Sequence, residues 1–189
     1  MVKFLVGPEE STTEFEVHKE FVSYYSPVLD AAFNGGFQEE ETKTYRLEDT
    51  TAGAFRYFLH WIYGQNLELD EKSSISTKAH HLVRLWVLAD FLVIPRLQNA
   101  VIAKIHEMSE QENVVFVRVL DYVYENTSDD TCPLRRYFVN ELAFNYSGGF
   151  KEPELFPSEL LLELARVTTR VSPADLKPLS SFLILVEED

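Results

Sequence analysis

Cysteine is nearly absent from this sequence, since Cys132 is the only one among 189 residues. A single cysteine excludes an internal disulfide and a metal site built from several thiolates. Chains without disulfides are typical of reducing compartments, so we expect this one in the cytoplasm or nucleus. Arg135 and Arg136 follow Cys132 and favour a lowered thiol pKa. Because no histidine lies nearby in the sequence, we interpret Cys132 as a structural residue, exposed or half-buried.

Basic residues and long hydrophobic runs are also scarce. The chain has 17 Lys and Arg against 31 Asp and Glu, which gives a net charge of −14. This charge repels phosphate backbones, and the densest basic stretch is only the pair Arg135–Arg136, so we expect no nucleic acid partner. No apolar run approaches the roughly 18 residues of a membrane-spanning helix, and the first ten residues do not resemble a secretory signal. We therefore expect no membrane partner.

The patterns that usually mark catalysis or cofactor binding are missing. The glycine pairs at 35–36 and 148–149 lack both the lysine of a phosphate loop and the dinucleotide fingerprint. His80 and His81 are adjacent, so on a helix they point about 100° apart and cannot share a metal as an i, i+4 pair does. The acidic run at 39–41 has no further oxygen ligands at the spacing of a cation cage. We expect no enzymatic activity, no metal and no cofactor.

What the sequence does contain is the pattern of a folded domain. Its residues are 46% hydrophobic and 13% aromatic, which is typical of a globule with a real core. Residues 2–6 form a short apolar run. Apolar residues alternate with polar ones in TEFEVHK, at Phe15 and Val17, and in KTYRLED, at Tyr45 and Leu47. This period of two predicts strands with one buried face.

Helical patterns separate and follow these strands. Ser26 can cap a helix that has Pro27 at its first position and ends at Gly35. Apolar spacing predicts further helices over 54–64 and around 82–89, and Pro95 suits the start of the next one. Beyond residue 110 three more apolar patterns, the last reaching Val171, predict an all-helical segment.

The stretch FEVHKEFVSYYSPVLDAAFNGGFQE resembles the core of the BTB/POZ family. The matching positions are Phe15, Val17, His18, Lys19, Ser26, Pro27, Phe33 and Gly35. The likeness continues through KTYRLED, AFRYFLHWIYG and LVRLWVLADFLVIPRLQNAVIAKI, and SPVLDAAFNGGF is similar to fungal members in particular. The resemblance implies an α+β BTB/POZ fold over residues 1–109, a small mixed sheet of short strands capped by a helical cluster. An all-helical extension over 110–189 would follow it, and the whole would serve protein–protein interaction.

Two structural expectations accompany this resemblance. His18 lies at a strand-to-helix junction, where a buried imidazole can bond to backbone groups that would otherwise be unpaired. The sequence also begins at the first strand, without the N-terminal extension that many dimeric members exchange. We therefore do not expect a domain-swapped dimer, while a monomer and a dimer through the helical face both remain open.

The segment FNGGFQEEET, residues 33–42, places one large apolar residue, Phe37, between two glycines and a run of acid. Phe37 either packs back under its own loop or is exposed so that a partner can bind it. In cullin-binding members of the family a hydrophobic-x-Glu triplet occupies this loop, and Phe37-Gln38-Glu39 is similar to it. The resemblance thus implies a substrate adaptor that docks on a cullin ubiquitin-ligase scaffold and holds an unknown client. The alternative is a homo- or hetero-oligomerisation module in transcriptional or scaffolding complexes. A weaker echo of the triplet occurs at Phe150-Lys151-Glu152.

Overall fold

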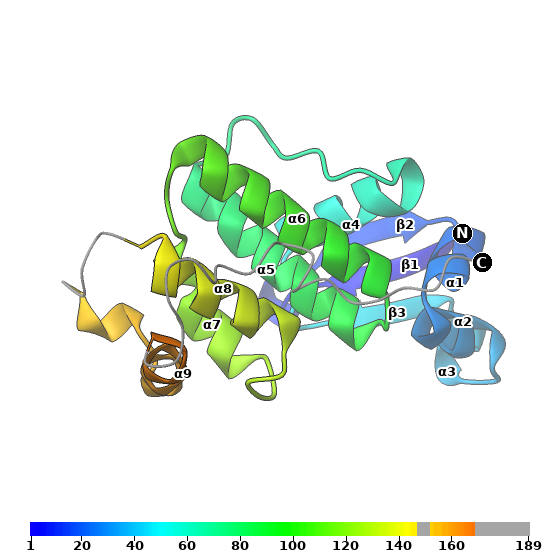
Figure 1. Ribbon diagram of the computed structural model, residues 1–189. Helices are drawn as coiled ribbons and strands as arrows, with labels where there is room; N and C mark the ends of the chain where they lie inside the picture. Colours follow the sequence, from blue (N-terminus) through cyan, green and yellow to red (C-terminus); the bar gives the residue numbers. More distant parts are fainter. Residues whose placement is uncertain (147–151, 169–189) are drawn as a thin grey trace.

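A computed structural model describes residues 1–146 and 152–168 of the chain. The strands β1 (Val2–Val6), β2 (Thr13–Val17) and β3 (Thr44–Leu47) form one sheet in the order β2-β1-β3. β1 is antiparallel to β2 and parallel to β3, so the sheet is mixed. The sheet packs on α4, where the ring of Phe55 lies 5.0 Å from that of Phe4 and 4.8 Å from that of Phe15; in the view of Figure 1 the long helices α5 and α6 lie in front of it. The predicted α+β fold with a small mixed sheet is confirmed.

Aromatic residues in register join the three strands. Phe4 of β1 lies opposite Phe15 of β2 and Tyr45 of β3. The ring of Phe4 is fully buried, with its centroid 5.9 Å from that of Tyr45 and 5.0 Å from that of Phe55. Cross-strand aromatic pairs of this kind stabilise a sheet as short as this one.

The described helices account for most of the remaining chain. They are α1 (Lys19–Tyr25), α2 (Pro27–Asn34), α3 (Gln38–Thr42), α4 (Ala52–Gly64), α5 (Ile75–Phe91), α6 (Pro95–Glu112), α7 (Leu120–Glu125), α8 (Pro133–Phe144) and α9 (Ser158–Thr168), with 3-10 turns η1 (Glu9–Ser11), η2 (Val117–Val119) and η3 (Pro153–Leu155). The sequence did not predict α1 or α3. In α3 the acidic run fills the first turn, where carboxylates interact favourably with the helix dipole.

The start of α2 is fixed by Ser26, as the sequence predicted. Its buried hydroxyl oxygen accepts a hydrogen bond from the Leu29 N–H at 3.1 Å, and Pro27 occupies the first helical position. The same hydroxyl donates to the Leu92 carbonyl at the end of α5, 2.7 Å away. One side chain therefore caps α2 and joins it to a helix 66 residues further along the chain.

The C-terminal helices share the core of the preceding domain. Buried residues from Val2 to Leu164 form one hydrophobic cluster, and the predicted boundary after residue 109 falls within the last turn of α6. The division at that residue stays a prediction. The last part of the helical pattern, at Val171, lies outside the described residues. No described helix combines the length and apolar character that a bilayer crossing requires.

Arg135 on α8 is buried and joins three helices of the extension. Its guanidinium donates to the carbonyls of Tyr124 and Thr127 at 2.8 and 2.6 Å. It also lies 3.3 Å from a carboxylate oxygen of Glu159 and 3.9 Å from one of Glu163, both on α9. Because the guanidinium of Arg135 is buried and paired with these carboxylates, Arg135 and Arg136 do not form an exposed basic pair.

The sequence interpretation of Cys132 was wrong in two respects. The residue is buried, with 8% of its surface exposed, rather than exposed or half-buried. Burial raises the pKa of its thiol, because an apolar surrounding disfavours the thiolate. The backbone N–H groups of Arg135 and Leu134 lower this pKa in part, but burial outweighs them, and the guanidinium of Arg135 is directed to α9 and to backbone carbonyls.

Candidate functional site

The loop between α2 and α3 holds Phe37 away from the core. The side chain is 57% exposed, so most of its ring faces water, although one edge lies close to Gly35. Gly36 has a φ of +79°, a conformation that L-residues with a side chain rarely adopt. At Gly35 an added Cβ would lie 2.4 Å from the Ala31 carbonyl oxygen and 3.2 Å from Cε2 of Phe37. Each glycine is therefore required, one for its backbone angle and the other for space.

Hydrogen bonds fix both ends of this loop. The Gly36 N–H donates to a carboxylate oxygen of Glu40, 2.8 Å away on α3. On the other side, the Lys19 ammonium donates to the Phe33 carbonyl at the end of α2, at 2.9 Å. The exposed ring of Phe37 thus stands on a fixed backbone. Holding an anchor in place before binding reduces the ordering cost of association.

The other two residues of the predicted triplet flank this ring. Gln38 is exposed and begins α3, while Glu39 is half-buried on the first turn. Burial raises the pKa of the Tyr45 hydroxyl on β3, and the carboxylate of Glu39 raises it further. The structure therefore brings an exposed aromatic ring and a carboxylate together on one short segment. Figure 1 shows α3 at one end of the molecule, opposite α9.

The remaining signature residues mostly support the fold. Val17, Ser26 and Phe33 are buried and Phe15 is half-buried, whereas Pro27 and Gly35 are exposed at the two ends of α2. These positions carry packing, capping and turn geometry rather than chemistry.

The expectation for His18 was wrong, because its side chain is exposed. The hydrogen bond to the backbone at this junction is made by Tyr63 instead. The His18 N–H donates to the Tyr63 hydroxyl at 3.0 Å, and Nδ1 of the imidazole lies 2.9 Å from the same oxygen. The hydroxyl of Tyr63, on α4, is thus the acceptor for the backbone N–H of the residue that precedes α1.

A second exposed aromatic group surrounds that junction. Phe21, Tyr24 and Tyr63 are 40%, 78% and 45% exposed, and we call them the α1 aromatic surface. Phe21 and Tyr24 are three residues apart on α1 and so share a face. The ring of Phe21 lies 4.8 Å from that of Tyr63. Exposed aromatic residues gathered in this way are typical of protein interfaces.

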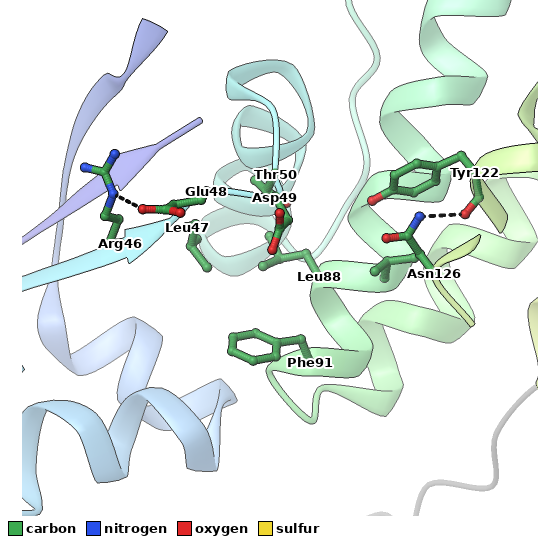
Figure 2. A pocket seen from close by; sticks show the side chains of 10 residues that line it. Arg46, Leu47, Glu48, Asp49, Thr50, Leu88, Phe91, Tyr122 and Asn126 are labelled. Carbon is green, nitrogen blue, oxygen red and sulfur yellow. Dashed lines mark hydrogen bonds and ion pairs between the residues drawn. The ribbon is translucent and has the colours of Figure 1, made fainter. Parts of the chain in front are cut away.

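A pocket that no sequence pattern predicts lies where the extension meets the sheet. We call it the junction pocket, and Figure 2 shows it from close by. It is lined by the end of β3 and the residues that follow it (46–50), by the end of α5 and by α7. Its lining residues are Arg46, Leu47, Glu48, Asp49, Thr50, Val87, Leu88, Phe91, Tyr122 and Asn126. No periodicity could reveal it, because its walls are distant in the sequence.

Within residues 1–146 and 152–168, no group of three His, Cys, Asp or Glu side chains is arranged to hold a metal ion. Of the echoed triplet, Phe150 and Lys151 lie outside the described residues. Glu152 is exposed and forms an ion pair with Arg118, with a nitrogen–oxygen distance of 3.0 Å. The candidate features of the described residues are therefore the exposed aromatic side chains of Phe37 and of the α1 aromatic surface.

Comparison with known families agrees with this architecture. The family model for the BTB/POZ domain matches residues 2–109, more than half of the chain. The chain belongs to the BTB/POZ domain family. A search of curated proteins found no match. BTB/POZ domains are interaction modules rather than enzymes, and they mediate contacts with protein partners and self-association. The narrower resemblance to fungal members stays a prediction.

Proposed function

We propose that this protein is a substrate adaptor that docks on a cullin ubiquitin-ligase scaffold through the loop between α2 and α3. The observation that carries the proposal is the exposed ring of Phe37 on a backbone fixed by Gly36 and Glu40. The ring enters an apolar groove of the scaffold, and the carboxylate of Glu39 engages the rim. Aromatic residues buried at an interface centre commonly supply about 2 kcal/mol or more of binding free energy.

Binding of the full chain to a purified cullin, measured by biolayer interferometry, tests this proposal. Phe37→Ala should weaken binding about 30-fold or more, which corresponds to the loss of about 2 kcal/mol. Tyr24→Ala is the matched control, because it removes an even more exposed ring from another surface. Unchanged cullin affinity of Phe37→Ala, with the helical content of the wild type, would overturn the adaptor role.

The α1 aromatic surface favours a second function, self-association or pairing with another BTB/POZ chain. Phe21, Tyr24 and Tyr63 together form an apolar area that water covers in the isolated chain. Size-exclusion chromatography with light scattering separates the two functions. If the domain oligomerises through this surface, Tyr24→Ala lowers the mass of the assembly, whereas Phe37→Ala leaves it unchanged.

A further inference from the structure

The junction pocket has the size and lining of a site for one large side chain. It holds about 210 Å³, less than the roughly 300–1,000 Å³ of typical small-molecule sites. Leu47 and Leu88 are buried at its base, and Tyr122 is half-buried beside them. Phe91 is 58% exposed although it belongs to a long, well-packed helix. Figure 2 shows Phe91 and Leu47 directed into the same space, with Tyr122 across from them.

The pocket adjoins a free strand edge. β3 is the last strand of the sheet on its side, and it pairs only with β1 among the described residues. The Lys3 and Gly7 N–H groups donate to the carbonyls of residues 43 and 47, so the odd-numbered residues of β3 face β1. Arg46 lies between two such residues, so in a parallel ladder its N–H and C=O point to the outer edge of the sheet. Such an edge is a template for one more strand.

Two carboxylates, those of Glu48 and Asp49, line the pocket beside this edge. The Arg46 guanidinium is already paired with Glu48, with Nε 2.6 Å from the carboxylate oxygen. The guanidinium of Arg84 lies over the Tyr122 ring, 4.1 Å from its centroid. Asp49 lines the pocket and is exposed. Glu48, the other carboxylate of the lining, is exposed as well.

We propose that the junction pocket binds an extended peptide segment of a partner protein. The segment adds to the outer edge of β3, places one large aliphatic side chain against Phe91, and brings a lysine or arginine beside Asp49. Pairing with the strand edge supplies affinity, while the pocket and the carboxylates select the sequence. This site does not depend on cullin binding. In an adaptor it would be the place that holds the client, at the end of β3 away from α3.

Selection of peptides from a random phage-displayed library on the immobilised full chain tests this proposal. The selected sequences should share an aliphatic residue with a lysine or arginine close to it. In fluorescence polarisation, a labelled selected peptide should bind Phe91→Ala about 30-fold more weakly than the wild type. Asp49→Asn should weaken it about 2–5-fold and reduce its dependence on salt. Leu162→Ala, which removes a comparably exposed apolar side chain from α9, is the matched control.

Methylation of alternate peptide nitrogens tests the pairing mode. Blocking the amides of one register should abolish binding, and blocking the other register should not, because only every second amide faces β3. The proposal is overturned if no peptide is enriched, if enriched peptides lack the basic residue, or if Phe91→Ala binds them as well as the wild type does. Phe37→Ala should bind the peptide normally, so a failure of cullin docking and a failure of this site give different results.

Discussion

Replacement of Arg135 by methionine should cost this protein a large part of its stability. The substitution keeps most of the buried volume but removes the donors that the carbonyls of Tyr124 and Thr127 use. It also leaves the carboxylate of Glu163, whose side chain is 12% exposed, without its cation. Removing one partner of a buried charge pair typically costs about 3–5 kcal/mol. For a chain of this size that loss corresponds to a fall of about 6–20 °C in melting temperature.

Guanidinium unfolding, followed by circular dichroism and by tryptophan fluorescence, measures this loss. Arg136→Met is the matched control, since the neighbouring side chain is exposed and its removal should change stability by no more than about 0.5 kcal/mol. Adding Glu163→Gln to Arg135→Met should recover part of the loss. Glu163→Gln removes the uncompensated charge and keeps a side-chain oxygen that accepts from the Tyr124 hydroxyl. In the wild type this hydroxyl donates to a carboxylate oxygen of Glu163 at 2.7 Å. A loss below about 1 kcal/mol for Arg135→Met would refute the role given to this residue.

Three further substitutions or conditions should change stability in defined directions. Ser26→Ala should lower the free energy of unfolding by about 1–3 kcal/mol in urea titrations, because it removes the cap of α2 and leaves the Leu92 carbonyl without the hydroxyl donor of Ser26. An unchanged midpoint would contradict this. Val93 has a φ of +55° and is 52% exposed, so Val93→Gly should relieve backbone strain and raise the free energy of unfolding by about 0.5 kcal/mol; a lower melting temperature would count against the strain. Burial, and secondarily the Glu141 carboxylate, raises the pKa of Tyr137 above its ordinary value. The unfolded chain therefore loses this proton first, so the contribution of Tyr137 to stability is complete below pH 10 and falls by about 1.4 kcal/mol per pH unit above it. Denaturation series across this range check the slope, which should become shallower by this amount in Tyr137→Phe, while the slope due to Tyr124, whose pKa burial also raises, should remain.

Local chemistry explains which parts of the fold the sequence could predict. Ser26, Pro27 and Gly35 determine the ends of α2 through capping, a preset φ and the absence of a Cβ, and all of these act within a few residues. The alternation in β2 and β3 likewise depends only on one buried face. α1 and α3 span seven and five residues, too few for an apolar period to stand out.

The errors and omissions came from contacts between distant residues. His18 is exposed, and its backbone N–H donates to the hydroxyl of Tyr63, 45 residues away. Cys132 is buried, and the guanidinium of Arg135 is directed to α9 and to the carbonyls of Tyr124 and Thr127. The junction pocket combines β3, α5 and α7, which no local pattern in the sequence brings together. The exposure of Phe37 depended in the same way on the folding of the loop around two glycines.

Site-specific crosslinking from position 37 tests the central claim most directly. A photoreactive phenylalanine analogue in place of Phe37 keeps an aromatic ring at the exposed position, and the same analogue at Tyr24 serves as the comparison. After illumination with a purified cullin, position 37 should give a covalent product whose mass-spectrometric map lies in an apolar groove of the scaffold, and position 24 should give none. A crosslink from position 24 alone, or from position 37 only to residues of its own chain, would contradict docking through this ring.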